Sequence, residues 1–269
     1  MNPPGLTVIV PVFNAPGETR RCLRALRRTL EGDPARIMVI DDASTDPAIP
    51  GVLHEVCDPA WSVERNPGNL GFVGTVNLGM QRAGSDDVVL LNSDTVPAGT
   101  WLDRIRRCAA SDPAIASITP WTNNGEIVSL PTFCEAAPVP DDVERWAAAC
   151  AAVEPCYPDL PTAVGFCMFL RRACLEEIGR FDAETFGRGY GEENDWCMRA
   201  TGAGWRHVLC DSAFVAHQGQ ASFGPLGLAP GEESMQRLLG LHPDYLERVM
   251  AFIRSDPLAG PRERVLARL

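Results

Sequence analysis

Short apolar segments alternate with helix-like segments through the first half of the chain, and this alternation constrains the fold more than any other feature. The expected strands are 6–13, 36–40, 61–64, 86–91 and 114–119, and the expected helices are 18–30, 72–82 and 100–109. Strands that are apolar throughout are buried on both faces, as in a parallel sheet covered by helices. The pattern therefore predicts an α/β fold with a mostly parallel sheet flanked by helices.

The second half of the chain is less regular. Pro, Asn and acidic residues fill 122–160, around a short helix expected near 143–152. The later expected strands are 163–172, 205–209 and 213–216, and the later helices are 172–179, one from Glu192, 232–240 and 243–254. We expect one domain over 1–225, divided at about residue 120, and a helical extension over 226–269.

Charge and composition exclude several classes of protein. The net charge is −11, and all 24 basic residues are Arg. Such a chain lacks the basic surface that nucleic-acid binding requires, and it has no Lys for a phosphate clamp or a Schiff base. No apolar run is long enough for a membrane helix, and the N-terminus does not resemble a signal peptide, so we expect a cytoplasmic protein. The ten cysteines contain no C-x-x-C pair and are expected to be reduced and mostly buried.

Polar residues follow three of the expected strands. They are Asn14 after the first strand, Asp41 and Asp42 after the second, and Asn92, Ser93 and Asp94 after the fourth. The carboxyl ends of parallel strands share one edge of the sheet, where proteins of this class bind ligands. A carboxylate-rich site of this kind can hold a phosphate through a divalent cation. The chain has neither the G-x-G-x-x-G nor the Walker phosphate-binding motif.

Five motifs occur in a fixed order along the chain. They are VIVPVFN, VIDDASTD, NPGNLGFVGTVNLGM, LLNSDTVP and GRGYGEENDWCMRATGAGW. In this combination the chain resembles family 2 glycosyltransferases of the GT-A fold, over roughly residues 6–223. Residues 186–224 are most similar to bacterial enzymes that build O-antigen, rhamnan and other surface polysaccharides. The resemblance implies a donor half over about 1–120 and an acceptor half over about 121–225.

The resemblance also implies a divalent metal, Mg²⁺ or Mn²⁺. Asp94 matches the last acid of the family's D-x-D motif, whereas Asn92 replaces the first. His217, in AFVAHQG, stands where similar enzymes contact the metal or the diphosphate. Such a metal neutralises the charge that develops on a diphosphate leaving group. The alternatives are that Asp94 caps a turn and that His217 is structural.

The nucleotide is expected to lie against the first two strand ends. By resemblance, Asp42 accepts the imide N–H of uracil or thymine, so UDP and dTDP donors are not distinguished. Phe13 packs on the base and Pro11 shapes the turn. The alternatives are turn capping by Asp41 or Asp42 and an ordinary core position for Phe13.

The remaining donor-site residues come from the same edge. Gly71, in GNLGFVGTVN, allows the backbone to approach the ribose and diphosphate. Asn77 follows on the next helix, whose start can face phosphate. Asn14, Asn92 and Ser93 complete the expected nucleotide-binding set.

An inverting transferase needs a carboxylate that removes the acceptor's proton. GEENDWC supplies Glu192, Glu193 and Asp195 at the start of a helix. Glu193 occupies the position of the catalytic Asp in the family's E-D-x-D pattern, and Glu192 and Asp195 are its rivals. Carboxylates also favour helix starts for structural reasons, and Asp195 is spaced to form an exposed pair with Arg199.

The segment TPWTNNGE carries Trp121, Asn123 and Asn124. The resemblance places it near the sugar and acceptor, and the alternative is a plain polar loop.

We therefore expect a metal-dependent inverting glycosyltransferase that moves a sugar from UDP or dTDP to a hydroxyl of a glycan or lipid-linked glycan. A role in surface-polysaccharide synthesis, at the inner face of the membrane, is part of this expectation. A nucleotidyltransferase is the enzymatic rival, but its Gly-rich loop with Lys or Arg is missing. The other alternative is an inactive nucleotide-sugar or glycan-binding module of a multi-domain protein. Neither the sugar nor the linkage follows from the sequence.

Overall fold

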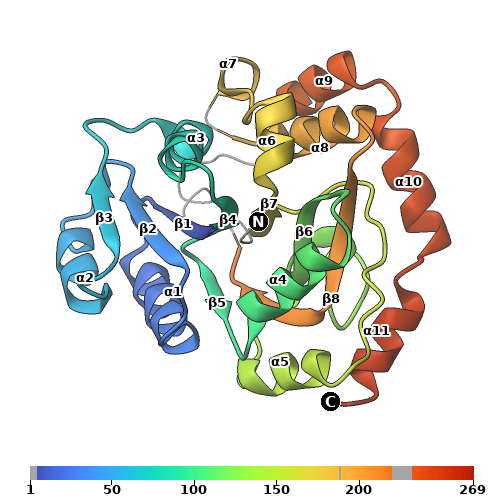
Figure 1. Ribbon diagram of the computed structural model, residues 1–269, viewed down its shortest axis with the longest axis horizontal. Coiled ribbons are helices and arrows are strands. Elements are labelled where there is room, and N and C mark those ends of the chain that lie inside the picture. Colours follow the sequence, from blue (N-terminus) through green and yellow to red (C-terminus); the bar gives the residue numbers. More distant parts are fainter. Residues whose placement is uncertain (1–4, 188, 220–231) are drawn as a thin grey trace.

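A central sheet of eight strands organises the molecule, and helices flank it as the sequence predicted (Figure 1). The computed structural model describes residues 5–187, 189–219 and 232–269. The strand order is β3-β2-β1-β4-β7-β6-β8-β5. The strands are β1 Leu6–Val12, β2 Arg36–Asp41, β3 Ser62–Arg65, β4 Asp87–Leu91, β5 Thr95–Pro97, β6 Ile115–Trp121, β7 Cys167–Leu170 and β8 Arg206–His217.

The first four strands of this order are parallel, as expected. β1 pairs with β2 and β4, and β2 pairs with β3. The connecting helices are α1 Pro16–Thr29, α2 Ile49–Val56 and α3 Gly71–Arg82, of which α2 was not predicted. Successive residues of β1 enter different apolar clusters: Val8 and Val10 pack with α1 and α2, while Ile9 packs with α3. This two-sided burial explains why the strand is apolar throughout.

The other half of the sheet is mixed. β7 is antiparallel to β4 and β6, β6 is parallel to β8, and β5 is antiparallel to β8. β8 was expected as two strands and is one long strand, with a register shift against β6 between Pro120 and Trp121. The three-residue β5 was not predicted, because so short a strand has no pattern of its own.

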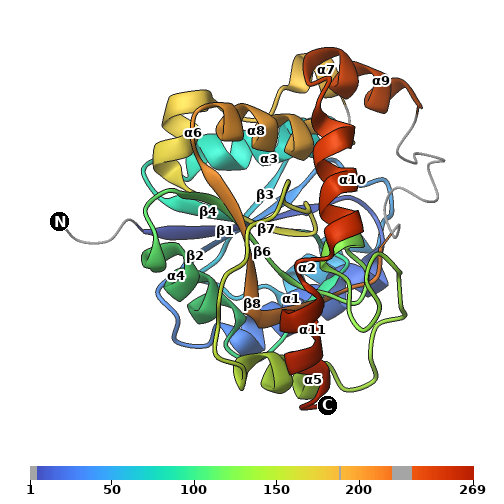
Figure 2. The same cartoon turned by 90° about the vertical axis from the view of Figure 1, so that its right-hand side faces the viewer.

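Helices cover the mixed half and one side of the molecule. They are α4 Trp101–Ser111, the 3₁₀ helix η1 Glu126–Val128, α5 Val143–Ala151, α6 Arg172–Ile178, α7 Ala183–Phe186, α8 Glu192–Gly202, α9 Glu232–Leu241, α10 Tyr245–Ser255 and α11 Ala259–Leu266. The last three run from α7 and α8 to α5 (Figure 2). The sequence predicted α9 and α10 but not α11.

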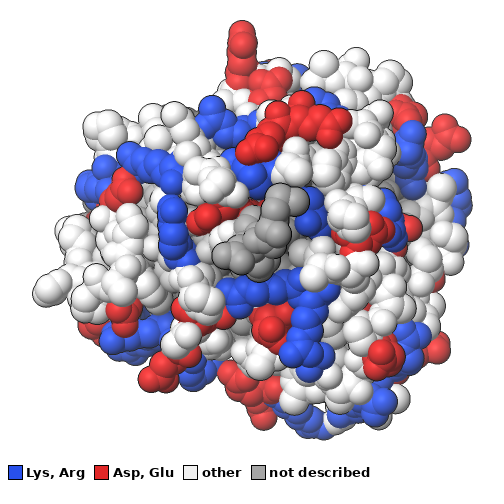
Figure 3. Space-filling view, in the orientation of Figure 1, with Lys and Arg blue, Asp and Glu red and all other residues white. Residues whose placement is uncertain are grey.

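The sequence analysis also concerned the cysteines, the surface charge and membrane-spanning helices. All ten cysteines lie in the described part, where they are free and mostly buried. Acidic and basic side chains are interspersed over the face shown in Figure 3. No helix within the described ranges has the length and apolar character needed to cross a membrane.

Candidate active site

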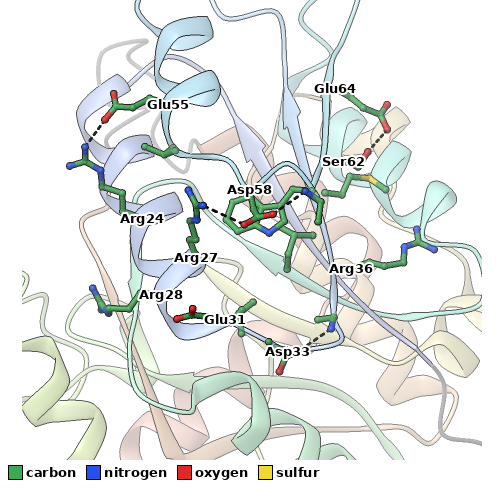
Figure 4. A pocket seen from close by; sticks show the side chains of 18 of the residues that line it. Arg24, Arg27, Arg28, Glu31, Asp33, Arg36, Glu55, Asp58, Ser62 and Glu64 are labelled. Carbon is green, nitrogen blue, oxygen red and sulfur yellow. Dashed lines mark hydrogen bonds and ion pairs between the residues drawn. The ribbon is translucent and has the colours of Figure 1, made fainter.

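Two cavities in the structure differ in position and chemistry. The larger, about 1010 Å³, lies at the amino ends of β2 and β3 against α1 and α2 (Figure 4). The smaller, about 430 Å³, lies at the carboxyl ends of β1, β2 and β4. Ten of the thirteen predicted site residues line the smaller cavity: Pro11, Phe13, Asp42, Gly71, Asn92, Ser93, Asp94, Glu192, Glu193 and His217.

The part of this cavity formed by Asn92, Asp94 and His217 joins two distant segments. We call it the metal corner, after the cation that the sequence predicts there. Thr95 of β5 pairs with His217 of β8, and this pairing brings His217 beside Asp94. The Nε2 of His217 lies 3.5 Å from an Asp94 carboxylate oxygen. The Nδ1 of His217 donates to the carbonyl oxygen of Asn124 at 2.7 Å, which orients the ring with Nε2 toward the carboxylate. An imidazole nitrogen and a carboxylate that face each other need a shared cation, which is a proton or a metal.

The electrostatics of His217 agree with this geometry. Burial lowers the pKa of His217, but the Asp94 carboxylate and the Asn124 carbonyl together raise it by more, so the net shift is upward. The ring also stacks on Phe166, with centroids 5.2 Å apart. The imidazole is therefore fixed in position and responds to charge at Asp94.

The donor set at this corner fits an oxygen-preferring cation. The amide oxygen of Asn92 is buried and has no hydrogen-bond partner among the described residues. Asn92, Asp94 and His217 thus offer an amide oxygen, a carboxylate and an imidazole, which suit Mg²⁺ or Mn²⁺. No group of three or more His, Cys, Asp or Glu in the described ranges is arranged to hold a metal. Any cation here would complete its coordination with ligand oxygens and water.

Asp42 organises the turn into α3. Its carboxylate accepts hydrogen bonds from Asn66 Nδ2 at 2.9 Å, Leu70 N at 2.8 Å and Gly71 N at 2.9 Å. Gly71 has a φ of 73°, a conformation that favours glycine. Asp41 instead binds Arg65 and Ser44 N. Asp41 is thus the structural acid of the pair, while Asp42 also faces the cavity.

Two predicted nucleotide-binding residues, Asn14 and Asn77, use their amides within the protein. The Asn14 amide oxygen accepts from the backbone N–H groups of Thr45 and Asp46, both at 2.9 Å. The Asn77 amide donates to the Phe181 carbonyl at 2.8 Å and accepts from the Phe181 N–H at 3.1 Å. Neither residue lines the cavity. The Asn14 amide nitrogen donates to the Thr45 hydroxyl at 3.3 Å, so both amides are occupied within the protein and both residues fix loops.

Glu192 and Glu193 enter the cavity from the start of α8. Gly191, at φ 98°, turns the chain into the helix. Burial and the neighbouring Glu193 charge raise the pKa of Glu192 well above its usual range, and burial raises the pKa of Glu193. A side chain at Gly165 would begin 3.7 Å from the Glu193 carboxyl, so this glycine leaves room beside it. Raised carboxyl pKa values in a cavity are typical of acid–base sites.

Asp195, the third candidate base, lies outside the cavity lining. Its carboxylate binds Arg199 Nε at 2.8 Å and His242 Nε2 at 2.8 Å. The Asp195 side chain is 3% exposed and that of Arg199 is 29% exposed, so the pair is partly buried and not the exposed pair that the spacing suggested. These contacts favour a structural role for Asp195.

Several lining residues were not among the predicted site residues, and they include Glu126, Met235, Leu238 and Tyr245. Glu126 lies in the same segment as Trp121 and Asn123, but those two side chains are buried and do not line the cavity. Asn124 does line it. The resemblance placed the segment TPWTNNGE, which ends at Glu126, near the sugar and acceptor, but it did not single out Glu126. Nothing in the pattern of the C-terminal helices indicated a site, because their positions depend on packing.

Comparison with known proteins supports the fold and the family. The model of glycosyl transferase family 2 matches residues 7–179. An N-acetylglucosaminyltransferase of Rhizobium leguminosarum bv. phaseoli is 25% identical over 82% of this chain and 51% of its own length. An uncharacterized protein of Mycobacterium tuberculosis is 27% identical over 80% of this chain and 74% of its own.

Two solved structures share the architecture. GalNAc-T7 with UDP, GalNAc and Mn²⁺ has a TM-score of 0.69 and 15% identity, over 99% of this chain and 55% of that one. The mannosyltransferase PcManGT of Pyrobaculum calidifontis, with GDP-Man and Mn²⁺, has a TM-score of 0.57 and 17% identity, over 99% and 79%. The fold is thus the GT-A type that the sequence predicted. The chain spans about half the length of the Rhizobium protein and of GalNAc-T7.

Proposed function

Because this chain belongs to glycosyl transferase family 2, we propose that it transfers a sugar from UDP or dTDP to a glycan hydroxyl with inversion, using a divalent cation. The resemblance of residues 186–224 supports a place in bacterial surface-polysaccharide synthesis, with a glycan or lipid-linked acceptor at the inner face of the membrane. The chain's share of its longer relatives is compatible with a part in a multi-domain transferase.

One observation carries this proposal: the balance of charge in the smaller cavity. Its described lining contains five acidic residues and no Arg; the acids are Asp42, Asp94, Glu126, Glu192 and Glu193. A diphosphate is repelled by such a lining unless a cation lies between them. Asp94 and His217 would hold that cation, with the Asn92 amide oxygen nearby. When bound, the metal would supply Lewis-acid stabilisation of the leaving diphosphate.

The nucleotide-binding side supports a pyrimidine donor. Three protein donors fix the Asp42 carboxylate, so it is presented to a base in one orientation. A carboxylate accepts the imide N–H that uracil and thymine share. Phe13 and Pro11 line the same side and supply apolar surface for the base.

Glu193 is the proposed base of the transfer. It lines the cavity at the start of α8, beside the open space at Gly165. Burial raises its pKa, which makes the carboxylate a stronger proton acceptor. In this mechanism Glu193 takes the proton of the acceptor hydroxyl as the oxygen attacks the anomeric carbon from the face opposite the diphosphate.

Calorimetric titration with UDP, dTDP and GDP, each with Mn²⁺ and with EDTA, tests the donor site. We expect UDP or dTDP to bind with Mn²⁺ and to lose binding in EDTA. Preference for GDP would retain a transferase but overturn the role of Asp42. Binding of none of the three would overturn the donor site and favour the alternative, a glycan-binding module without activity.

A further inference from the structure

One wall of the smaller cavity comes from segments that the donor site does not use. Glu126 of η1, Met235 and Leu238 of α9, and Tyr245 at the start of α10 line it. We refer to these four residues as the C-terminal wall. α9 packs against α8, whose first turn carries Glu192 and Glu193. The wall thus borders the carboxylates of α8.

The C-terminal wall is fixed to α8. Leu238 and Tyr245 pack with Phe186 and Met198 in a separate apolar cluster. His242, in the turn between α9 and α10, binds the buried Asp195 at 2.8 Å. Since Asp195 lies in the first turn of α8 with Glu193, this contact sets the position of the wall relative to the proposed base.

The chemistry of the wall suits a sugar ring. Leu238 and Tyr245 are largely buried and Met235 is 38% exposed, so the three present apolar surface at the cavity edge. A pyranose offers C–H faces to such a surface and hydroxyl donors to a carboxylate. Glu126 supplies that carboxylate, from a backbone φ of 50° that non-glycine residues adopt at a cost.

The charges of this wall limit which sugar can bind. Glu126, Glu192 and Glu193 all line the cavity, and the charge of Glu126 contributes to the raised pKa of Glu193 and of Tyr245. A further negative charge on the ligand would add to this repulsion, whereas an uncharged ring would not.

We infer that the C-terminal wall is the acceptor subsite and that it selects an uncharged sugar over a uronate or a phosphorylated sugar. This inference rests on the proposed transferase function and extends it to the class of acceptor. Glu126 accepts hydroxyls of the ring, and Met235, Leu238 and Tyr245 contact its apolar face.

Saturation-transfer NMR of methyl glycosides, with UDP and Mg²⁺ present, tests this directly. We expect the wild-type protein to bind methyl glucoside or methyl rhamnoside at least about tenfold more tightly than methyl glucuronide. Glu126→Gln should reduce that ratio at least about threefold, although Glu192 and Glu193 remain. Equal or tighter binding of the glucuronide by the wild type, or binding of no glycoside at all, would overturn the inference.

A matched pair of α9 variants tests the apolar part. Met235→Ala should weaken binding of the neutral glycosides about threefold to tenfold. Leu241→Ala should not change it, because Leu241 is exposed at 51% on the same helix but does not line the cavity. Both side chains are exposed, so neither change threatens folding. Equal effects of the two variants would contradict the proposed subsite.

Measuring UDP binding distinguishes failure of this inference from failure of the transferase proposal. If UDP binds with Mg²⁺ but glycoside binding is the same in the wild type and in the Glu126 and Met235 variants, only the acceptor inference is wrong. If UDP does not bind, the donor site itself is wrong.

Discussion

Both cavities of this protein are lined by acidic side chains, but only the larger one also contains arginines among its described lining residues. In the larger one, each of the five lining arginines has an acidic partner; the pairs are Arg24–Glu55, Arg27–Asp58, Arg28–Glu144, Arg36–Asp86 and Arg82–Glu64. Figure 4 shows the first two of these pairs. In the smaller one, the acids gather without an Arg among the described lining residues. The larger volume is therefore electrostatically neutralised, and the smaller one is not.

This difference shows why volume is a poor guide to function. Exposed ion pairs contribute little to stability and leave little net field for a ligand. Like charges gathered in a cavity oppose folding, and such arrangements are characteristic of binding and catalytic sites. The predictions below test this contrast, beginning with the largest expected effect.

Asp94→Asn should reduce transfer by about a thousandfold or more, because the cation loses its strongest ligand. Metal-dependent UDP binding, followed by calorimetry, should disappear with it. Asp58→Asn is the matched control: Asp58 pairs with Arg27 in the larger cavity, and its loss should leave transfer unchanged. Wild-type transfer by the Asp94 variant would remove the basis of the metal corner.

Glu193→Gln should reduce the rate of transfer by about a hundredfold to ten-thousandfold, the range for loss of a general base. UDP binding with Mn²⁺ should be retained. Since burial raises the pKa of Glu193 above 4.5, the wild-type rate should fall on acidification at a pH above that value, as the base becomes protonated. A rate profile without an acidic limb in the wild type, or full activity in the variant, would point to another base.

His242→Ala should lower the free energy of unfolding by about 1–3 kcal/mol, because the buried Asp195 loses one of its two partners. Denaturant unfolding measures this change, and the acceptor KM should rise as the C-terminal wall loosens. His54→Ala, an exposed change in α2 beside the larger cavity, should have neither effect. Equal stability of the two variants would mean that His242 does not fix the C-terminal helices to α8.

Glu192→Gln should stabilise the protein, in contrast to most substitutions of buried residues. Burial, and then the Glu193 charge, raise the pKa of Glu192 in the folded state. A carboxyl with a raised folded pKa stabilises the protein at low pH, and this stabilisation is lost as the pH rises through that pKa. The gain in Tm should therefore grow with pH and vanish at acidic pH. A gain that does not depend on pH would argue against charge as its cause.

Arg24→Ala should have the smallest effect. Arg24 is exposed, and Glu55 keeps Arg20 as a partner, so the free energy of unfolding should fall by about 1 kcal/mol or less. Transfer and nucleotide binding should not change. A loss of either would give the larger cavity a functional role. It would also contradict the conclusion that only the smaller cavity is a functional site.

The pattern of the chain predicted the donor half of the fold and most of the candidate site. Val8, Ile9 and Val10 are apolar because both faces of the sheet are covered, and this local requirement can be read directly from sequence. Asp94 was predicted because it follows a strand, and Glu193 because it matches the family's E-D-x-D pattern at the start of a helix. Asn14 and Asn77 were predicted on the same edge, but their amides hold loops outside the described cavity lining, because an amide near a site is equally suited to holding a loop.

By itself, the sequence determined the α/β class, the family resemblance and the edge of the sheet that carries the acids. Periodicity and motif order are local properties, so they survive without coordinates. Only the tertiary structure decided that β5 brings His217 to Asp94, that His242 fixes the C-terminal helices to Asp195, and that Glu126 and Tyr245 share a wall with Glu193. These contacts join residues far apart in the chain, and packing alone sets their distances.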